Sequence, residues 1–164
     1  AYAEFSEQEL ALSLLSGRER LIISRTMSKA FAFAGARVGY LAADESVVDA
    51  LRIVRLPYHL SALTQAAASA ALDFAPLMLQ NVEKIKVQRD RIIKALLEFG
   101  LKPYRSDSNF VLVAGFENPG EVFDKLLARG VLIRNVGIPG TLRITAGTES
   151  ETTKLLAELA LILD

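Results

Sequence analysis

Apolar residues recur at helical spacing in several stretches of the chain, and polar residues that can cap helices precede them. The longest stretches predict helices over 45–54, 62–74 and 77–99. Asp44 and Ser61 precede the first two, where a carboxylate or hydroxyl oxygen can accept free backbone N–H groups. Ser6 and Glu9 match a capping box, which predicts a shorter helix from Ser6 to about Leu15.

Short apolar runs predict strands between the helices. Two of these runs, 20–24 and 38–42, flank a segment rich in small and hydroxylated residues. After Gly100 the pattern changes to predicted strands at 110–114, 131–134 and 142–145, with helices at 119–128 and 149–163. This alternation predicts a small α+β domain, with a sheet on one side and helices on the other.

Composition narrows the function classes. Hydrophobic residues make up 51% of the chain, enough for a core, and Lys+Arg and Asp+Glu number 19 each. A net charge of zero argues against a nucleic-acid binder that relies on a basic surface. Cysteine is absent and His59 is the single histidine, so neither a disulfide framework nor a zinc site is expected.

Hydropathy along the chain bears on localisation. No apolar run approaches the ~20 residues of a membrane span. The first residues, AYAEFSEQEL, lack the basic and apolar regions of a signal peptide. We therefore expect a cytoplasmic protein without a membrane, nucleic-acid or metal partner.

Residues 24–40, SRTMSKAFAFAGARVGY, carry the first candidate chemistry. Thr26 and Ser28 place hydroxyl groups just past a predicted strand, where open α/β sheets bind ligands. Arg37 can present a planar guanidinium to a phosphate. The alternative is an ordinary surface loop whose lysine and arginine are solvated.

Lys29 lies at the centre of this segment. We expect Phe31 and Phe33 to shield its amine partly from water, which disfavours the charged form. A neutral amine is the better nucleophile towards an aldehyde. The segment therefore favours a lysine that reacts with a carbonyl group.

Arg134 and Arg143 form a second candidate site. Each adjoins an apolar strand pattern, VLIR or LRIT. Two arginines at strand ends in a small domain can converge on an anion. Alternation along the strands also allows either side chain to point into solvent, and the pattern does not decide between the two.

These motifs resemble those of known enzymes. Ser28-Lys29 followed by Gly-x-Arg-x-Gly-Tyr at 35–40 resembles the lysine segment of fold-type I pyridoxal-phosphate aminotransferases. RLPYHLS at 55–61 and GIPG at 137–140 resemble the histidinol-phosphate aminotransferases, especially their actinobacterial branch. The resemblance covers nearly the whole chain. It implies an α/β fold in which 1–74 is the carboxyl-terminal part of the large cofactor-binding domain and 75–164 is the small carboxyl-terminal α+β domain.

The resemblance also implies roles for individual residues. Lys29 would form the Schiff base with pyridoxal 5'-phosphate and serve as general base. Arg37, Ser28 and, as a weaker candidate, Thr26 would bind the phosphate. Tyr2 would hydrogen-bond the ring oxygen of the cofactor.

In such enzymes, arginines matching Arg134 and Arg143 face the anionic group of the substrate. The implied activity is transamination of histidinol phosphate with 2-oxoglutarate in histidine biosynthesis, by a homodimer acting on an amino-group donor and a 2-oxo acid. One alternative is an aminotransferase for aromatic or other amino acids. Another is an inactive carboxyl-terminal fragment, which we expect to self-associate or to be loosely ordered around the lysine loop.

Overall fold

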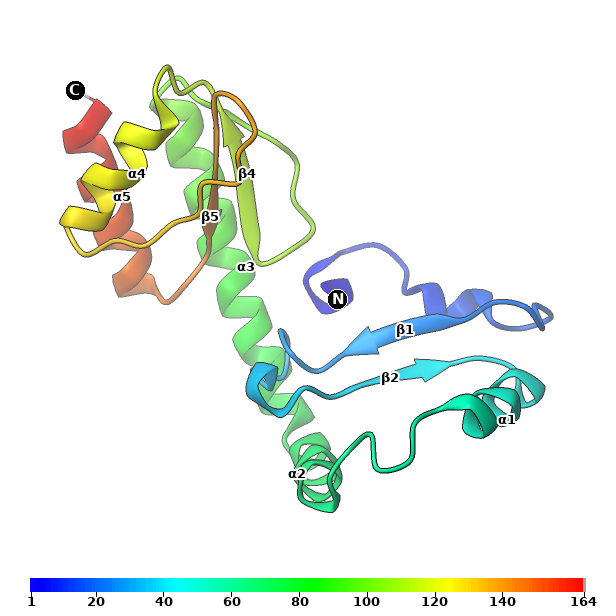
Figure 1. Ribbon diagram of the computed structural model, residues 1–164. Helices are drawn as coiled ribbons and strands as arrows, with labels where there is room; N and C mark the ends of the chain where they lie inside the picture. Colours follow the sequence, from blue (N-terminus) through cyan, green and yellow to red (C-terminus); the bar gives the residue numbers. More distant parts are fainter. Residues whose placement is uncertain (164) are drawn as a thin grey trace. The chain divides into compact units, whose positions relative to one another are not determined.

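Antiparallel strand pairs form both sheets of the structure, a computed structural model that describes residues 1–163. The chain divides into two units, Ala1–Asn81 and Val82–Asp164. The division falls inside the longest helix, α3 (Ala75–Glu98) (Figure 1). The first unit holds the sheet β1-β2, and the second holds the sheet β3-β4-β5.

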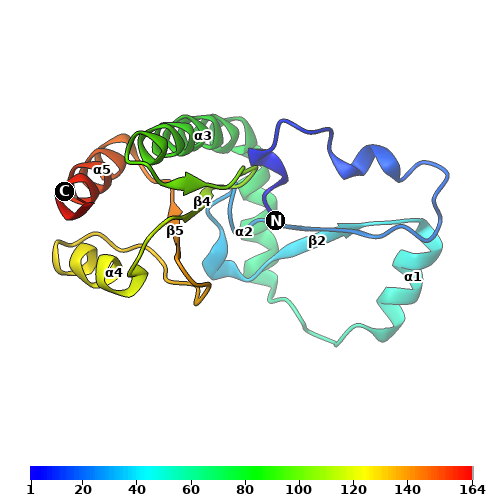
Figure 2. The ribbon, with the colours of Figure 1, turned by 90° about the horizontal axis from the view of Figure 1, so that it is seen from above.

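Each unit contains both helices and strands, and the five long helices agree closely with the sequence pattern. Besides the start of α3, the first unit contains η1 (Ala3–Phe5), η2 (Ala11–Leu14), β1 (Ile23–Thr26), η3 (Ala34–Ala36), β2 (Gly39–Ala42), α1 (Glu45–Val54) and α2 (Ala62–Asp73). Besides the rest of α3, the second contains β3 (Lys102–Pro103), β4 (Phe110–Ala114), α4 (Pro119–Ala128), β5 (Thr141–Thr145) and α5 (Glu149–Leu163) (Figure 2). All five long helices were predicted, whereas the short strand β3 was not.

Side-chain caps explain where the helices begin. The Asp44 carboxylate accepts the backbone N–H of Ser46 at 3.0 Å, and the Ser61 hydroxyl accepts that of Thr64 at 3.0 Å. At the start of α5 the Glu151 carboxylate accepts the Thr148 N–H at 2.7 Å, and this bond lowers the pKa of Glu151. These bonds satisfy amide groups that have no partner inside the helix.

Alternation along β4 and β5 builds the core of the second unit. One face of the sheet presents side chains that are almost fully inaccessible to solvent: Val111, Val113, Leu142 and Ile144. They pack with equally buried residues of the helices: Ile92, Leu96, Leu126 and Leu159. The opposite face includes Arg143, so burial on one face determines on which face this arginine lies.

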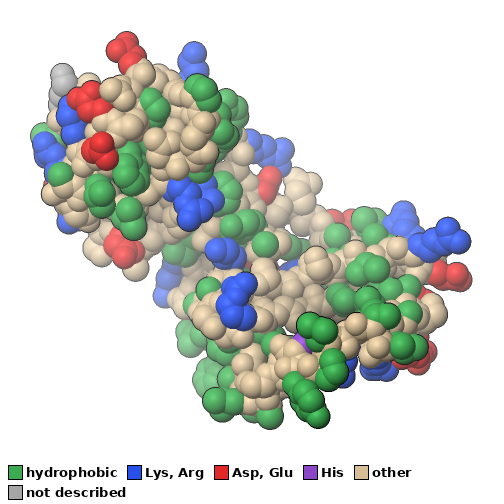
Figure 3. All heavy atoms as spheres, in the orientation of Figure 1, with side chains coloured by type: hydrophobic (Ala, Val, Ile, Leu, Met, Phe, Trp, Pro, Cys, Tyr) green, Lys and Arg blue, Asp and Glu red, His purple; other side chains and the backbone are tan. Residues whose placement is uncertain are grey.

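The first unit buries much less apolar surface. Neither α1 nor α2 has a buried residue. Tyr58, Ile53 and Leu63 are 100%, 84% and 81% exposed, and hydrophobic side chains are visible on this part of the surface (Figure 3). Large contiguous patches of exposed apolar surface commonly mark contact sites in soluble proteins. The expected self-association of this region stays a prediction.

The helix predicted from Ser6 to Leu15 is wrong. Ser6 and Leu10 have extended backbones, and only the short 3-10 turn η2 lies between Leu10 and Leu15. The Ser6 hydroxyl accepts the N–H of Gln8 at 3.0 Å, which closes a local turn in place of the capping box. No side chain of η2 is buried, so a short helix here would gain little from packing.

Two strand predictions also need correction. The first strand runs over Ile23–Thr26 instead of 20–24, because Leu21 closes a turn by donating its N–H to the carbonyl of Arg18. Segment 131–134 is not a strand and pairs only through a single bridge from Arg134 to Arg143. Asn135 Oδ1 accepts the N–H of Gly137 at 3.0 Å, which closes a turn directly after Arg134.

Residues 1–163 contain neither a single helix that could span a membrane nor a cluster of metal-ligating side chains. Within residues 1–163 no single helix is long and apolar enough to cross a bilayer, although α2 and α3, bent by 74° at their junction, pass that test of length and composition together. Within the same residues, no group of three or more histidine, cysteine, aspartate or glutamate side chains is arranged to hold a metal ion.

Neighbouring leucines of α3 test the core of the second unit. Leu96 is 0% exposed and Leu97 is 60% exposed. We expect Leu96→Ala to lower the free energy of unfolding of the chain by about 2–5 kcal/mol, since it leaves a cavity. Leu97→Ala should change it by about 0.5 kcal/mol or less. Urea titration monitored by circular dichroism measures both, and equal losses would show that the core is misplaced.

Candidate active site

The lysine loop, residues 27–38, connects β1 to β2. Backbone hydrogen bonds close the base of this loop, just past the end of the strand pair. Thr26 pairs with Gly39 at the end of the ladder. The Met27 N–H then donates to the carbonyl of Val38 at 3.3 Å, and the Phe33 N–H donates to that of Met27 at 3.1 Å. The side chain of Met27 is buried. The loop therefore has a defined shape at its base.

The same loop contains strained backbone. Ala32 and Arg37 have φ values of 51° and 55°, and Tyr58 is the third non-glycine residue with positive φ in the part of the chain that the structure describes. The left-handed conformation costs a residue with a Cβ atom roughly 1–2 kcal/mol. Such strain persists only where surrounding contacts hold it, often at functional sites.

The structure brings the two predicted hydroxyl groups together. Thr26 Oγ1 and Ser28 Oγ lie 2.6 Å apart, and the Ser28 N–H donates to Thr26 Oγ1 at 3.1 Å. Both side chains are partly buried. Together they form a small polar cluster at the end of β1, the position predicted from the sequence.

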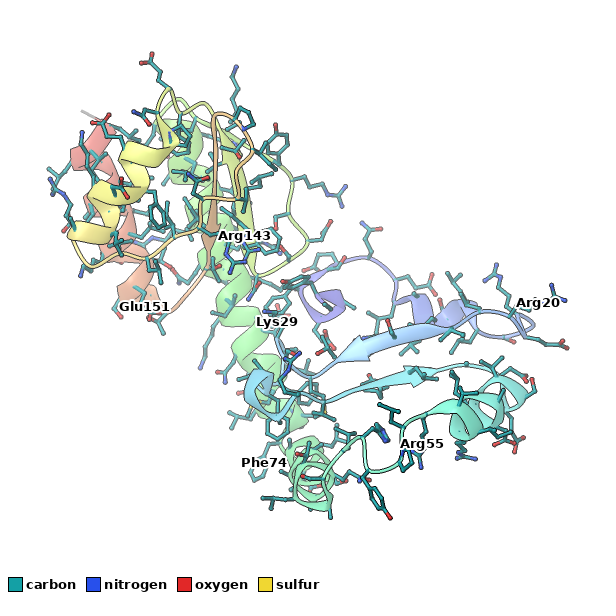
Figure 4. All side chains as sticks on the ribbon, viewed as in Figure 1. Arg20, Lys29, Arg55, Phe74, Arg143 and Glu151 are labelled. Atoms are coloured by element: carbon teal, nitrogen blue, oxygen red, sulfur yellow. The ribbon has the colours of Figure 1, made fainter. Side chains whose placement is uncertain are left out.

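Lys29 extends from the loop that follows β1 (Figure 4). Its Nζ lies 5.9 Å from the centroid of the Tyr2 ring, within the range of a cation–π contact. Lys29 is exposed, so the prediction that Phe31 and Phe33 partly shield its amine from water is wrong. Its neighbour Ala30 is turned inward and buried, which leaves the lysine on the outer side of the loop.

Arg37 ends η3 and is exposed. Its guanidinium donates to the carbonyl of Ala34 at 3.2 Å. Within residues 1–163 it forms no ion pair. The guanidinium therefore keeps donors that an anion could accept.

Arg134 and Arg143 come together in the second unit. Their backbones exchange two hydrogen bonds, of 2.9 and 2.8 Å. Directly opposed residues of an antiparallel pair project their side chains to the same face. The Arg143 guanidinium carbon lies 4.5 Å from the Phe110 ring centroid, and its Nε is buried without a hydrogen-bond partner.

The sequence patterns did not predict two interactions, one in each unit. Glu4 and Arg25 form an ion pair of 2.5 Å with both side chains largely buried. Phe110 stacks beneath Arg143 from the neighbouring strand. Arg25 lies in a strand with an apolar residue, Ile23, which was a signal that its charge needs a partner. That partner, Glu4, lies too far away in the sequence to be identified from a local pattern.

Comparison with known proteins assigns the chain to a family. The family described as aminotransferase class I and II matches residues 1–159. The chain therefore belongs to this family. The resemblance to histidinol-phosphate aminotransferases is also confirmed by curated relatives at high identity.

The histidinol-phosphate aminotransferase of Paenarthrobacter aurescens is 61% identical over 166 residues, which cover 100% of this chain and 45% of the relative. That of Streptomyces avermitilis is 51% identical over 156 residues, covering 95% and 42%. The crystal structure of the Sinorhizobium meliloti enzyme in complex with pyridoxal-5'-phosphate is 28% identical, has a TM-score of 0.83, and is matched over 99% of this chain and 47% of its own. The fold-type I transferase fold is thus confirmed, and the chain spans about half the length of the relatives it matches.

The orphaned Nε of Arg143 generates a prediction about stability. An unpaired buried donor costs about 1–3 kcal/mol, whereas a cation–π contact contributes about 0.5–1 kcal/mol. We therefore expect Arg143→Met to leave the free energy of unfolding of the chain unchanged or to raise it by about 1 kcal/mol. Arg134→Met, at an exposed position, is the control. A loss of more than about 2 kcal/mol on denaturant titration would mean that Arg143 serves stability.

Proposed function

We propose that the full-length protein is a pyridoxal-phosphate-dependent aminotransferase that transfers the amino group of histidinol phosphate to 2-oxoglutarate. The observation that carries the proposal is the lysine loop, where Lys29 stands beside the Tyr2 ring and next to paired hydroxyl groups. Family membership and the names of the relatives support it. In this proposal, residues 1–74 belong to the large cofactor-binding domain and 75–164 form the small domain.

The donor groups of the first unit suit the chemistry of pyridoxal 5'-phosphate. An aldehyde requires an amine, which Lys29 supplies. A phosphate ester requires cationic and hydroxyl donors, which Arg37, Ser28 and Thr26 offer. The ring oxygen requires a hydrogen-bond partner, and the Tyr2 phenol can provide one.

Each residue then has a distinct task. When bound, pyridoxal phosphate draws electrons from the substrate's α-carbon and makes the α-proton acidic. Lys29 Nζ would take this proton as general base and deliver it, as general acid, to the carbon that was the cofactor's aldehyde carbon. Arg37 and the hydroxyl pair fix the phosphate end, so that the reacting atoms stay in place relative to Lys29.

Arg134 and Arg143 would bind the anionic end of the substrate. Histidinol phosphate presents a phosphate ester and 2-oxoglutarate a carboxylate, and guanidinium groups bind both. The unpartnered Nε of Arg143 supports this role, because a buried donor without a partner is costly unless a ligand satisfies it. One cationic pocket then serves both substrates in turn.

We also propose that the full-length enzyme is a cytoplasmic homodimer. The exposed apolar residues around α1 and α2, among them Ile53, Tyr58 and Leu63, support a protein contact in this region. The partners that we propose are the small-molecule substrates and a second copy of the chain.

Borohydride trapping tests the role of Lys29. The full-length protein is incubated with pyridoxal phosphate, reduced so that the aldehyde is fixed to the lysine that carries it, and mapped by mass spectrometry. We expect the label on Lys29, because this lysine directly follows Ser28 of the hydroxyl pair and its Nζ lies beside the Tyr2 ring. Lys29→Ala should abolish it. Label on Lys84, Lys94 or Lys125 would contradict the assignment.

Substrate binding tests the two arginines. Arg143→Ala and Arg134→Ala in the full-length protein should each weaken binding of histidinol phosphate by ~1.5–3 kcal/mol, typical of a hydrogen bond to a charged group. Pyridoxal phosphate affinity should hardly change. Arg91→Ala, at an exposed position on α3, is the control. Unchanged affinity for both histidinol phosphate and 2-oxoglutarate in Arg143→Ala would leave this residue without a substrate role.

A further inference from the structure

The ion pair between Glu4 and Arg25 is unusual for its burial. The carboxylate and guanidinium are 2.5 Å apart, with the side chains of Arg25 and Glu4 only 9% and 13% exposed. The Asp49–Arg52 pair on α1, by comparison, is 57% and 67% exposed. Removing two charges from water is expensive, so a buried pair is weak support for a role in stability alone.

The position of the pair suggests a different role. Glu4 lies in η1, which begins directly after Tyr2, and Arg25 in β1 precedes Thr26. The pair therefore joins the segment that carries the phenol to the strand that carries the hydroxyl groups. A charge-assisted hydrogen bond is directional, and an apolar contact is not.

Two further contacts turn this connection into a constraint on Tyr2. The Phe5 side chain is buried, and the Phe5 N–H donates to the carbonyl of Tyr2 at 2.9 Å. The Tyr2 and Phe5 rings lie 6.4 Å apart between centroids. With Glu4 fixed to Arg25 and Phe5 fixed by burial, the Tyr2 ring is left beside Lys29 Nζ.

We propose that the Glu4–Arg25 pair is a positioning element that holds the Tyr2 phenol in register with Lys29 and so sets the affinity for pyridoxal phosphate. This inference rests on the proposed function. Neither Glu4 nor Arg25 acts on the cofactor directly, because both are paired with each other and their effect passes through Tyr2.

The test separates positioning from stability. Removing one partner strands a buried charge and can unfold the protein, whereas apolar replacement of both is often neutral or stabilising. The variant is therefore Glu4→Leu/Arg25→Met in the full-length protein. Asp49→Leu/Arg52→Met removes an exposed pair of the same residue classes and is the matched control.

Two readouts are measured for each variant. In cofactor-free protein, we expect the Phe5 amide to exchange with deuterium about tenfold faster in Glu4→Leu/Arg25→Met, with the melting temperature retained. The dissociation constant for pyridoxal phosphate should rise about tenfold, a coupling typical of residues in contact. The control variant should match the wild type in both.

A thermodynamic cycle with Tyr2→Phe shows whether the effect passes through the phenol. In the Tyr2→Phe background there is no hydroxyl to position, so adding Glu4→Leu/Arg25→Met should leave the dissociation constant nearly unchanged. An equally large effect in both backgrounds, or wild-type affinity and exchange in the double variant, would overturn the proposal. If the wild type itself binds no pyridoxal phosphate, the proposed function fails, while unchanged Phe5 exchange would still overturn the constraint on Tyr2.

Discussion

The close approach of β2 to β1 at Gly39 is the constraint on which the lysine loop depends. A Cβ atom at this position would lie 2.5 Å from the carbonyl oxygen of Arg25, closer than backbone atoms tolerate. The missing side chain lets Thr26 pair with Gly39 as the last step of the ladder. The two backbone hydrogen bonds that shape the loop, from Met27 to Val38 and from Phe33 to Met27, come next after this last pair of the ladder.

The two units hold the candidate side chains by different physical means. In the second unit, a buried sheet face determines that Arg143 lies on the opposite face, and Phe110 supports its guanidinium. In the first unit little is buried, and Lys29 is positioned by hydrogen bonds, a close backbone approach and one buried ion pair.

Local patterns predicted those parts of the fold that local interactions determine. The caps of Asp44 and Ser61 and the apolar stripe of α3 place helices where the structure has them. The helix from Ser6 failed because a capping pattern without a buried face gains too little from packing. Segment 131–134 failed because one bridge to Arg143 is not a ladder, and the turn at Asn135 ends the pairing.

The candidate site was predictable in part. The motif around Lys29 and the hydroxyl pair could be identified from residue types in order along the chain. The exposure of Lys29 could not, because it depends on which loop residues turn inward, here Met27 and Ala30. The ion pair of Glu4 with Arg25 is a tertiary contact that no local pattern specifies.

Hydrogen exchange in two glycine variants tests most directly the claim that the close approach at Gly39 shapes the lysine loop. Gly39→Ala introduces the forbidden Cβ atom, whereas a Cβ atom at Gly35 would meet nothing within 4 Å. Gly39→Ala should speed exchange of the Met27 and Phe33 amides by about tenfold, or about 1.4 kcal/mol of local opening, while Gly35→Ala leaves both near the wild type. Equal exchange in the two variants would contradict the account.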